Sequence, residues 1–226
     1  MMPVYSDQNS AALARAQGCL VGQLAGDALG SLVEFQSPEE IRRSYPQGVR
    51  KLADGGTWNT IAGQPTDDSE MALLLARMLV KRKAYDSSEA LKEYQFWLDS
   101  NPFDCGMTIS SALRGHKNHN SQANGAMMRI SPLGIVGVNY PLETVADWAK
   151  QDAALTHPNI VCLEANALFT MAITHAIKSG CTAHSLYENI SKWAANLVVG
   201  PALMDAILGA AETPPADYVE YQGWVL

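Results

Sequence analysis

Apolar side chains recur every three to four residues along most of this chain, and that spacing constrains its fold more than any other feature. After Thr66, for example, Met71, Leu74, Leu75 and Met78 follow the interval of one helix face. The same spacing predicts helices over 9–34, 67–83, 87–99, 106–114, 131–137, 142–153, 159–179, 183–197 and 201–211. The apolar/polar alternation of strands is almost absent. The sequence therefore predicts an all-α fold, with residues 1–226 as a single domain.

Composition and charge narrow the class of protein. The 226 residues are 47% apolar, which suits one domain with a sizeable core. Only 17% are charged, and the net charge is −7 with scattered lysines and arginines. A nucleic-acid-binding surface needs a basic patch, so we expect no nucleic-acid partner.

The cysteines and the N-terminal residues allow a prediction of the cellular compartment of the protein. Four cysteines, none in a C-x-x-C pair, suggest buried thiols in a reducing environment rather than disulfides or a zinc site. The N-terminal residues lack a basic segment followed by an apolar one, and no apolar run approaches the ~20 residues of a membrane span. These features predict a cytoplasmic protein with no membrane partner.

The last residues, Trp224-Val225-Leu226, are apolar where a domain end is usually polar. We interpret this as a chain that stops inside or just before a buried element, which would leave the fold incomplete at the C-terminus. The alternative is a short apolar tail that docks on the core.

The stretch "PTDDSE" has two interpretations. Thr66 or Asp67 suits a helix N-cap, and Asp67 with Glu70 has the spacing of a capping box. Alternatively, Asp67 and Asp68 lie ~100° apart around a helix and, with the Thr66 hydroxyl, offer oxygen ligands to Mg²⁺ or Mn²⁺.

Another acidic pair lies in "GDALGSLVEF". Asp27 and Glu34 are seven residues apart, so a continuous helix would place both on one side. The alternative is a close helix crossing that needs the small residues, with Asp27 bound by a neighbouring backbone.

Two further stretches carry polar residues at helix junctions. The glycine of "NGAMMR", Asn124–Arg129, allows backbone amides to approach a ligand, or else marks an ordinary turn. In "DAALTHP", Pro158 takes His157 out of helical geometry. His116 and His119 lie in a polar stretch that we expect to be a solvated loop.

In this order, "GDALGSLVEF", "PTDDSEMALLLA", "NGAMMRISPLGI" and "DAALTHPNIVCLEANALF" closely resemble the ADP-ribosylglycohydrolase family. The likeness runs from about residue 13 to the C-terminus. It implies an all-α orthogonal multi-helix bundle, and an enzyme that removes ADP-ribose from a modified protein side chain, most often arginine. It also implies two magnesium or manganese ions as cofactors.

The resemblance assigns roles residue by residue. It implies Thr66, Asp67 and Asp68 as metal ligands and Glu34, with Asp67, as catalytic. Substrate contacts are implied for Asp27, Asn124, Gly125, Ala126, Met127 and His157.

The sequence departs from the family in one respect. The family has a second metal motif, Gly-Asp-Thr-Asp-Thr, near its C-terminus, and these 226 residues contain none. Two octahedral ions need about a dozen ligand positions, more than the residues above supply. Three explanations are open: a separate C-terminal segment or chain completes the site, the product is truncated, or the protein binds ADP-ribose or opposes a transferase as an immunity or regulatory protein without catalysis.

Overall fold

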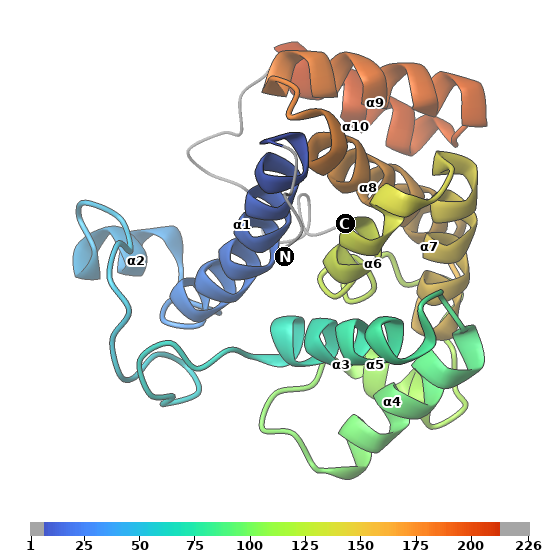
Figure 1. Ribbon diagram of the computed structural model, residues 1–226. Coiled ribbons are helices and arrows are strands. Elements are labelled where there is room, and N and C mark those ends of the chain that lie inside the picture. Colours follow the sequence, from blue (N-terminus) through green and yellow to red (C-terminus); the bar gives the residue numbers. More distant parts are fainter. Residues whose placement is uncertain (1–6, 213–226) are drawn as a thin grey trace, which may run out of the picture.

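The computed structural model describes residues 7–212, and within them the all-α prediction is confirmed (Figure 1). The helices are α1 (Asp7–Gly30), α2 (Pro38–Ser44), α3 (Asp67–Arg82), α4 (Ser87–Asp99), α5 (Met107–Leu113), α6 (Ser131–Val136), the 3₁₀ helix η1 (Gly137–Asn139), α7 (Leu142–Thr156), α8 (Ile160–Ser179), α9 (Ala183–Leu197) and α10 (Pro201–Glu212). The β-pairing in this range is an isolated bridge between Gly55 and Thr60. The features predicted for 216–226 lie outside the described residues.

Helix α8 is the central element, since it contacts α1, α6, η1, α7, α9 and α10. By length and apolar composition alone it could cross a membrane, so the expectation that no run approaches that length was wrong. Half of this stretch is buried inside the protein, as in the core helix of a globular fold. Its length therefore follows from the number of helices that it packs against.

The main core lies around α3, at the opposite end of Figure 1 from α9 and α10. The apolar face of α3 packs against α4 and α6, and buried residues of α5 and α7 belong to the same core cluster. The largest fully buried members include Met71, Leu75, Met78, Leu79, Ile109 and Leu133. This core holds the start of α3 in place, and the acids of the predicted metal site lie there.

Two differences from the sequence predictions bear on the site. Helix α1 ends at Gly30 and residues 31–35 form turns, so Glu34 does not share a continuous helix with Asp27. The chain turns because Leu32 and Val33 donate to carbonyls three residues back, and Phe35 has a φ of 62°. Helix α2 was not predicted, although Ser37, Pro38 and Glu40 carry a capping box that the structure forms.

The cysteine prediction needs a smaller correction. Cys162 is buried, as expected, whereas Cys19, Cys105 and Cys181 are only half-buried. All four thiols are free. The thiol of Cys162 lies against the carbonyl oxygens of Ser121 (3.6 Å) and Ala123 (3.7 Å), in the loop before α6.

Candidate active site

A cleft of about 710 Å³ opens where the end of α1, the start of α3 and two loops meet. Among residues 7–212, five carboxylates line it and no lysine or arginine does. The residues that line it include Asp27, Glu34, Thr66, Asp67, Asp68, Asp104, Gly106, Asn124, Gly125, Met128 and His157. Most residues assigned from the sequence are thus brought together, although they come from segments more than a hundred positions apart.

Asp27 caps helix α3 from another helix. Its carboxylate accepts hydrogen bonds from the backbone N–H of Thr66 (3.1 Å), the Thr66 hydroxyl (2.7 Å) and the backbone N–H of Ser69 (3.1 Å). The predicted Asp67–Glu70 capping box was wrong, because Asp67 is already helical and Glu70 accepts from Trp97 Nε1. Backbone binding of Asp27, one of the alternatives open from the sequence, is what the structure has. A close helix crossing does not explain the small residues of α1, since a Cβ on Gly22, for example, would meet nothing within 4 Å.

Replacing Asp27 with alanine should lower the free energy of unfolding by about 1–2 kcal/mol, the cost of a lost N-cap. The reason is that the first N–H groups of α3 lose their acceptor. Urea unfolding measures the change. Asp27→Asn, which keeps one acceptor oxygen and removes the charge, should lose less. Equal stability of the alanine variant and the wild type would contradict this capping role.

The start of α3 concentrates negative charge. Burial, then repulsion by Asp67 and Asp27, raises the pKa of Asp68 to about 7. Burial, then repulsion by Asp67 and Glu34, raises the pKa of Asp104 to about 7 as well. Burial also raises the pKa of Asp67, against the hydrogen bond that Oδ2 accepts from the Gly106 backbone (3.2 Å). The site therefore favours protons or other cations near its carboxylates.

Glu34 is held by the loop that follows α2. Trp58 Nε1 donates to its Oε2 at 2.8 Å, and the Thr57 hydroxyl donates to its carbonyl oxygen. Burial raises the pKa of Glu34, and the Trp58 bond opposes that rise. Gly56 lets the loop approach, because a Cβ there would lie 2.5 Å from the Ser31 carbonyl oxygen. Glu34 is thus a fixed carboxylate beside the acids of α3.

Asn124–Met128, a segment that also contributes to the cleft, forms a tight turn. The Asn124 carbonyl accepts from the N–H groups of both Met127 (2.7 Å) and Met128 (3.0 Å). The N–H groups of Gly125 and Ala126 make no hydrogen bond among the described residues. Gly125 is required by close packing, since a Cβ there would lie 2.9 Å from both His157 Cε1 and Ile109 Cδ1. Of these two residues only Gly125 lines the cleft, so its N–H is the donor of this turn that is left for a ligand.

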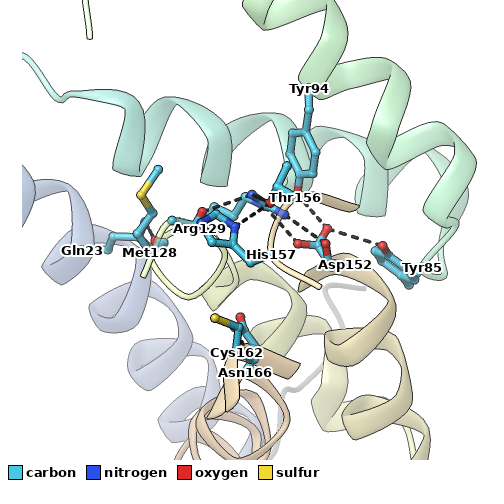
Figure 2. A network of polar contacts seen from close by, with 11 residues as sticks. Gln23, Tyr85, Tyr94, Met128, Arg129, Asp152, Thr156, His157, Cys162 and Asn166 are labelled. Carbon is cyan, nitrogen blue, oxygen red and sulfur yellow. Dashed lines mark hydrogen bonds and ion pairs between the residues drawn. The ribbon is translucent and has the colours of Figure 1, made fainter. Parts of the chain in front are cut away.

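A buried ion pair between Arg129 and Asp152 anchors this turn (Figure 2). The fully buried Arg129 donates through Nε to Asp152 Oδ2 (3.0 Å) and through Nη2 to the Asp152 carbonyl (3.0 Å). Its Nη1 donates to the Gly125 carbonyl (3.1 Å) and to Thr156 Oγ1 (2.9 Å). Tyr94 donates to Asp152 Oδ1 (2.8 Å), and its ring lies 4.4 Å from the guanidinium carbon. One guanidinium thus ties the turn to the C-terminal end of α7.

His157 follows the last residue of α7 and has no exposed surface. Its Nδ1 lies 2.8 Å from Thr156 Oγ1, whereas Nε2 is buried without a partner. Burial and the nearby charge of Arg129 lower its pKa to about 4. The ring is therefore neutral at pH 7. His116 and His119 are exposed in the loop before the turn, as predicted.

The lowered pKa of His157 predicts a pH effect on stability. The unfolded ring has a pKa near 6.5, so between about pH 6.5 and 4 the unfolded chain binds one proton more than the folded chain. Its contribution is complete above pH 6.5 and is lost as the pH falls toward 4. Relative to His157→Gln, the wild type should lose about 2 kcal/mol between pH 7 and 5 in urea unfolding. An unchanged difference between the two proteins would contradict a buried neutral ring.

Some assigned residues lie elsewhere, and some neighbours were missed. Ala126 is buried but does not line the cleft, and Met127 lines an adjoining pocket of about 430 Å³ with Phe169 and Ile173. Sequence reasoning missed Asp104, Trp58 and the Arg129–Asp152 pair. Asp104 lies in the short "NPFDCG" break between two helical patterns, and that break was its only local signal.

The oxygen-rich side of the cleft suits a hard cation chemically. Within residues 7–212, however, no three His, Cys, Asp or Glu side chains are grouped as ligands of one ion. The hydroxyl of Thr66 donates to Asp27, and its oxygen keeps the lone pairs that a cation would bind. The described residues thus provide acidic ligands for a metal site and not a completed one.

Comparison with known proteins agrees with this architecture. The family model described as ADP-ribosylglycohydrolase matches residues 8–226. The ADP-ribosyl-[dinitrogen reductase] glycohydrolase of Rhodospirillum rubrum is 33% identical over 153 residues, which are 63% of this chain and 51% of that protein. The ADP-ribosylarginine hydrolase Tri1 of Pseudomonas putida is 28% identical over 141 residues, 55% of this chain and 36% of that protein.

A solved structure shares the fold. It is described as an ADP-ribosylglycohydrolase-related protein complex, and it matches with a TM-score of 0.76 at 24% identity, covering 91% of this chain and 70% of that one. This chain spans about half the length of the first two curated relatives that it matches. Since the family model covers nearly every residue, this chain belongs to the ADP-ribosylglycohydrolase family.

Proposed function

We propose that this protein removes ADP-ribose from a mono-ADP-ribosylated protein side chain, with arginine as the acceptor and two Mg²⁺ or Mn²⁺ ions as cofactors. The observation that carries the proposal is the composition of the cleft. It is lined by carboxylates from α1, the turn after it, α3 and the 104–106 loop, and also by residues of the Asn124–Met128 turn and by His157. The names of two relatives, a dinitrogen reductase glycohydrolase and an arginine hydrolase, support the class of substrate.

Thr66, Asp67 and Asp68 would hold the ions, with Asp104 and Glu34 beside them. The raised pKa values of Asp68 and Asp104 support this, because a divalent cation there would relieve their repulsion. When bound, such ions act as Lewis acids that stabilise negative charge on ligand oxygens. Further ligands would come from water, substrate or a C-terminal segment or separate chain that completes the site.

The protein's own residues would position and activate the substrate. Gly125, which lines the cleft, offers a backbone N–H donor suited to a pyrophosphate oxygen. Glu34, fixed by Trp58, would orient the attacking water and accept its proton as the C1″–N bond breaks through an oxocarbenium-like state. The raised pKa of Glu34 makes it a better base than an exposed carboxylate. The arginine side chain would leave toward the negatively charged rim, which favours a cation.

The experiment follows ADP-ribose release from ADP-ribosylarginine and ADP-ribosylserine proteins, with and without Mg²⁺ or Mn²⁺. We expect metal-dependent release from the arginine substrate, and a fall of about 10²–10⁴-fold for Glu34→Gln, the contribution of a general base. Trp58→Phe, which keeps an aromatic side chain and removes the N–H donor to Glu34, should lose less activity. No release with either metal would refute hydrolysis by this chain.

The second function is ADP-ribose binding without catalysis. The incomplete grouping of metal ligands within residues 7–212 favours it. Tight ADP-ribose binding with no hydrolysis, even with metal present, would select this function.

A further inference from the structure

His157 is one of the residues that line the cleft, and its Nε2 is buried without a hydrogen-bond partner within residues 7–212. Leaving a buried polar atom without a partner costs about 1–3 kcal/mol, and Nε2 is one of three such side-chain atoms among the described residues. Its ring neighbour Cε1 lies against Gly125, which lines the same cleft as the carboxylates. A ligand that enters the cleft could therefore supply the hydrogen-bond partner that Nε2 lacks.

Which proton this nitrogen carries is set on the other side of the ring. Arg129 is a donor only, so at 2.9 Å the Thr156 hydroxyl must accept its N–H. The hydroxyl proton is then left to point elsewhere, and the acceptor within reach is His157 Nδ1 at 2.8 Å. Figure 2 shows the side chains of Arg129, Thr156 and His157 close together, with dashed lines for their hydrogen bonds.

The two neutral tautomers can be compared by counting unpaired groups. With the proton on Nε2, Thr156 donates to Nδ1, and only the Nε2–H lacks a partner. With the proton on Nδ1, both the hydroxyl proton of Thr156 and the Nε2 lone pair lack one. The charge of Arg129 acts in the same direction, because it favours a lone pair rather than an N–H on the side of the ring that faces it.

We propose that Arg129 and Thr156 act as positioning residues that fix His157 in its Nε2–H tautomer, so that the ring offers a ligand oxygen a hydrogen-bond donor and not a base. Only the identity of that ligand, ADP-ribose, rests on the proposed function. The lowered pKa of His157 agrees, since it keeps the ring neutral at pH 7. The donor would serve a phosphate or ribose oxygen lying over Gly125.

Nitrogen-15 NMR of the histidine rings tests the tautomer without any ligand. The chain has five histidines, and the signals that disappear in His157→Gln are those of His157. At pH 7 we expect a protonated Nε2 and an unprotonated Nδ1. A proton on Nδ1, or an equal mixture, would overturn the proposal.

Variants at Thr156 test the relay. Thr156→Ser keeps the hydroxyl and should keep the tautomer, whereas Thr156→Val should give a mixture while circular dichroism remains native. If the valine variant does not fold, Thr156→Ala tests the loss of the hydroxyl in its place. A valine or alanine variant with an unchanged Nε2–H spectrum would overturn the roles of Thr156 and Arg129.

ADP-ribose titration tests the donor role. His157→Leu should bind about tenfold more weakly, the loss of roughly one hydrogen bond, and His157→Gln, which keeps an N–H donor, should lose less. Equal binding by the leucine variant would overturn this role. If the wild type binds no ADP-ribose, the proposed function fails, and the ring spectrum still decides the tautomer.

Discussion

Replacing Arg129 with leucine is expected to lower the free energy of unfolding by about 3–5 kcal/mol, because it leaves Asp152 as an unpaired charge in the core. Both side chains are completely buried in the wild type. The guanidinium is also lost from the Gly125 carbonyl and from Thr156, so the turn loses its anchor. Urea unfolding at pH 7 measures the change.

Two controls separate this burial effect from the loss of any ion pair. Arg82 pairs with Glu89 at 2.9 Å, but its side chain is 44% exposed, so Arg82→Leu should cost at most about 1 kcal/mol. The double variant Arg129→Leu/Asp152→Leu should be more stable than the sum of the single losses predicts. Similar losses for Arg129→Leu and Arg82→Leu would contradict this account.

Replacing Asp68 with asparagine is expected to change stability in opposite directions with and without metal. In metal-free buffer the variant should be more stable than the wild type, because burial and repulsion hold the pKa of Asp68 near 7. With Mn²⁺ the wild type should gain stability as it binds the ion, and the variant should not. Thermal unfolding with and without Mn²⁺ measures both signs.

The same variant should bind Mn²⁺ at least about a hundredfold more weakly, since even outer partners of ligands cost 10–100-fold in affinity. Asp147→Asn, which removes an exposed acid of α7, is the matched control and should bind as the wild type does. If Asp68→Asn binds Mn²⁺ as tightly as Asp147→Asn, Asp68 is not a ligand.

Much of the fold could be predicted because each helix carries its own local signal. The apolar spacing of Met71 to Met78 and the caps at Asp86 and Thr182 act within one or two turns. The end of α1 at Gly30 could not be predicted the same way. The helical spacing continues through Leu32, but the loop around Gly56 packs against the turn. That contact joins segments that only the tertiary fold brings together.

The residues of the site likewise fall into those with a local sequence pattern and those that only tertiary contacts bring together. Thr66, Asp67 and Asp68 are adjacent in sequence, so their pattern was visible. Asp27 was noticed because an acid within an apolar helix needs a partner, but its partners, the amides of α3, are 39–42 residues away. Asp104 and the Arg129–Asp152 pair have no local pattern, and they enter the site only through packing.

Titration of ADP-ribose into this 226-residue chain, with and without Mg²⁺ or Mn²⁺, tests most directly the claim that the carboxylates and the Asn124–Met128 turn form one binding site. We predict binding that strengthens with the metal, and that weakens both in Asp68→Asn and in Gly125→Ala, whose Cβ would press on His157 and Ile109. Absence of binding under all conditions, or binding that neither variant changes, would contradict the account.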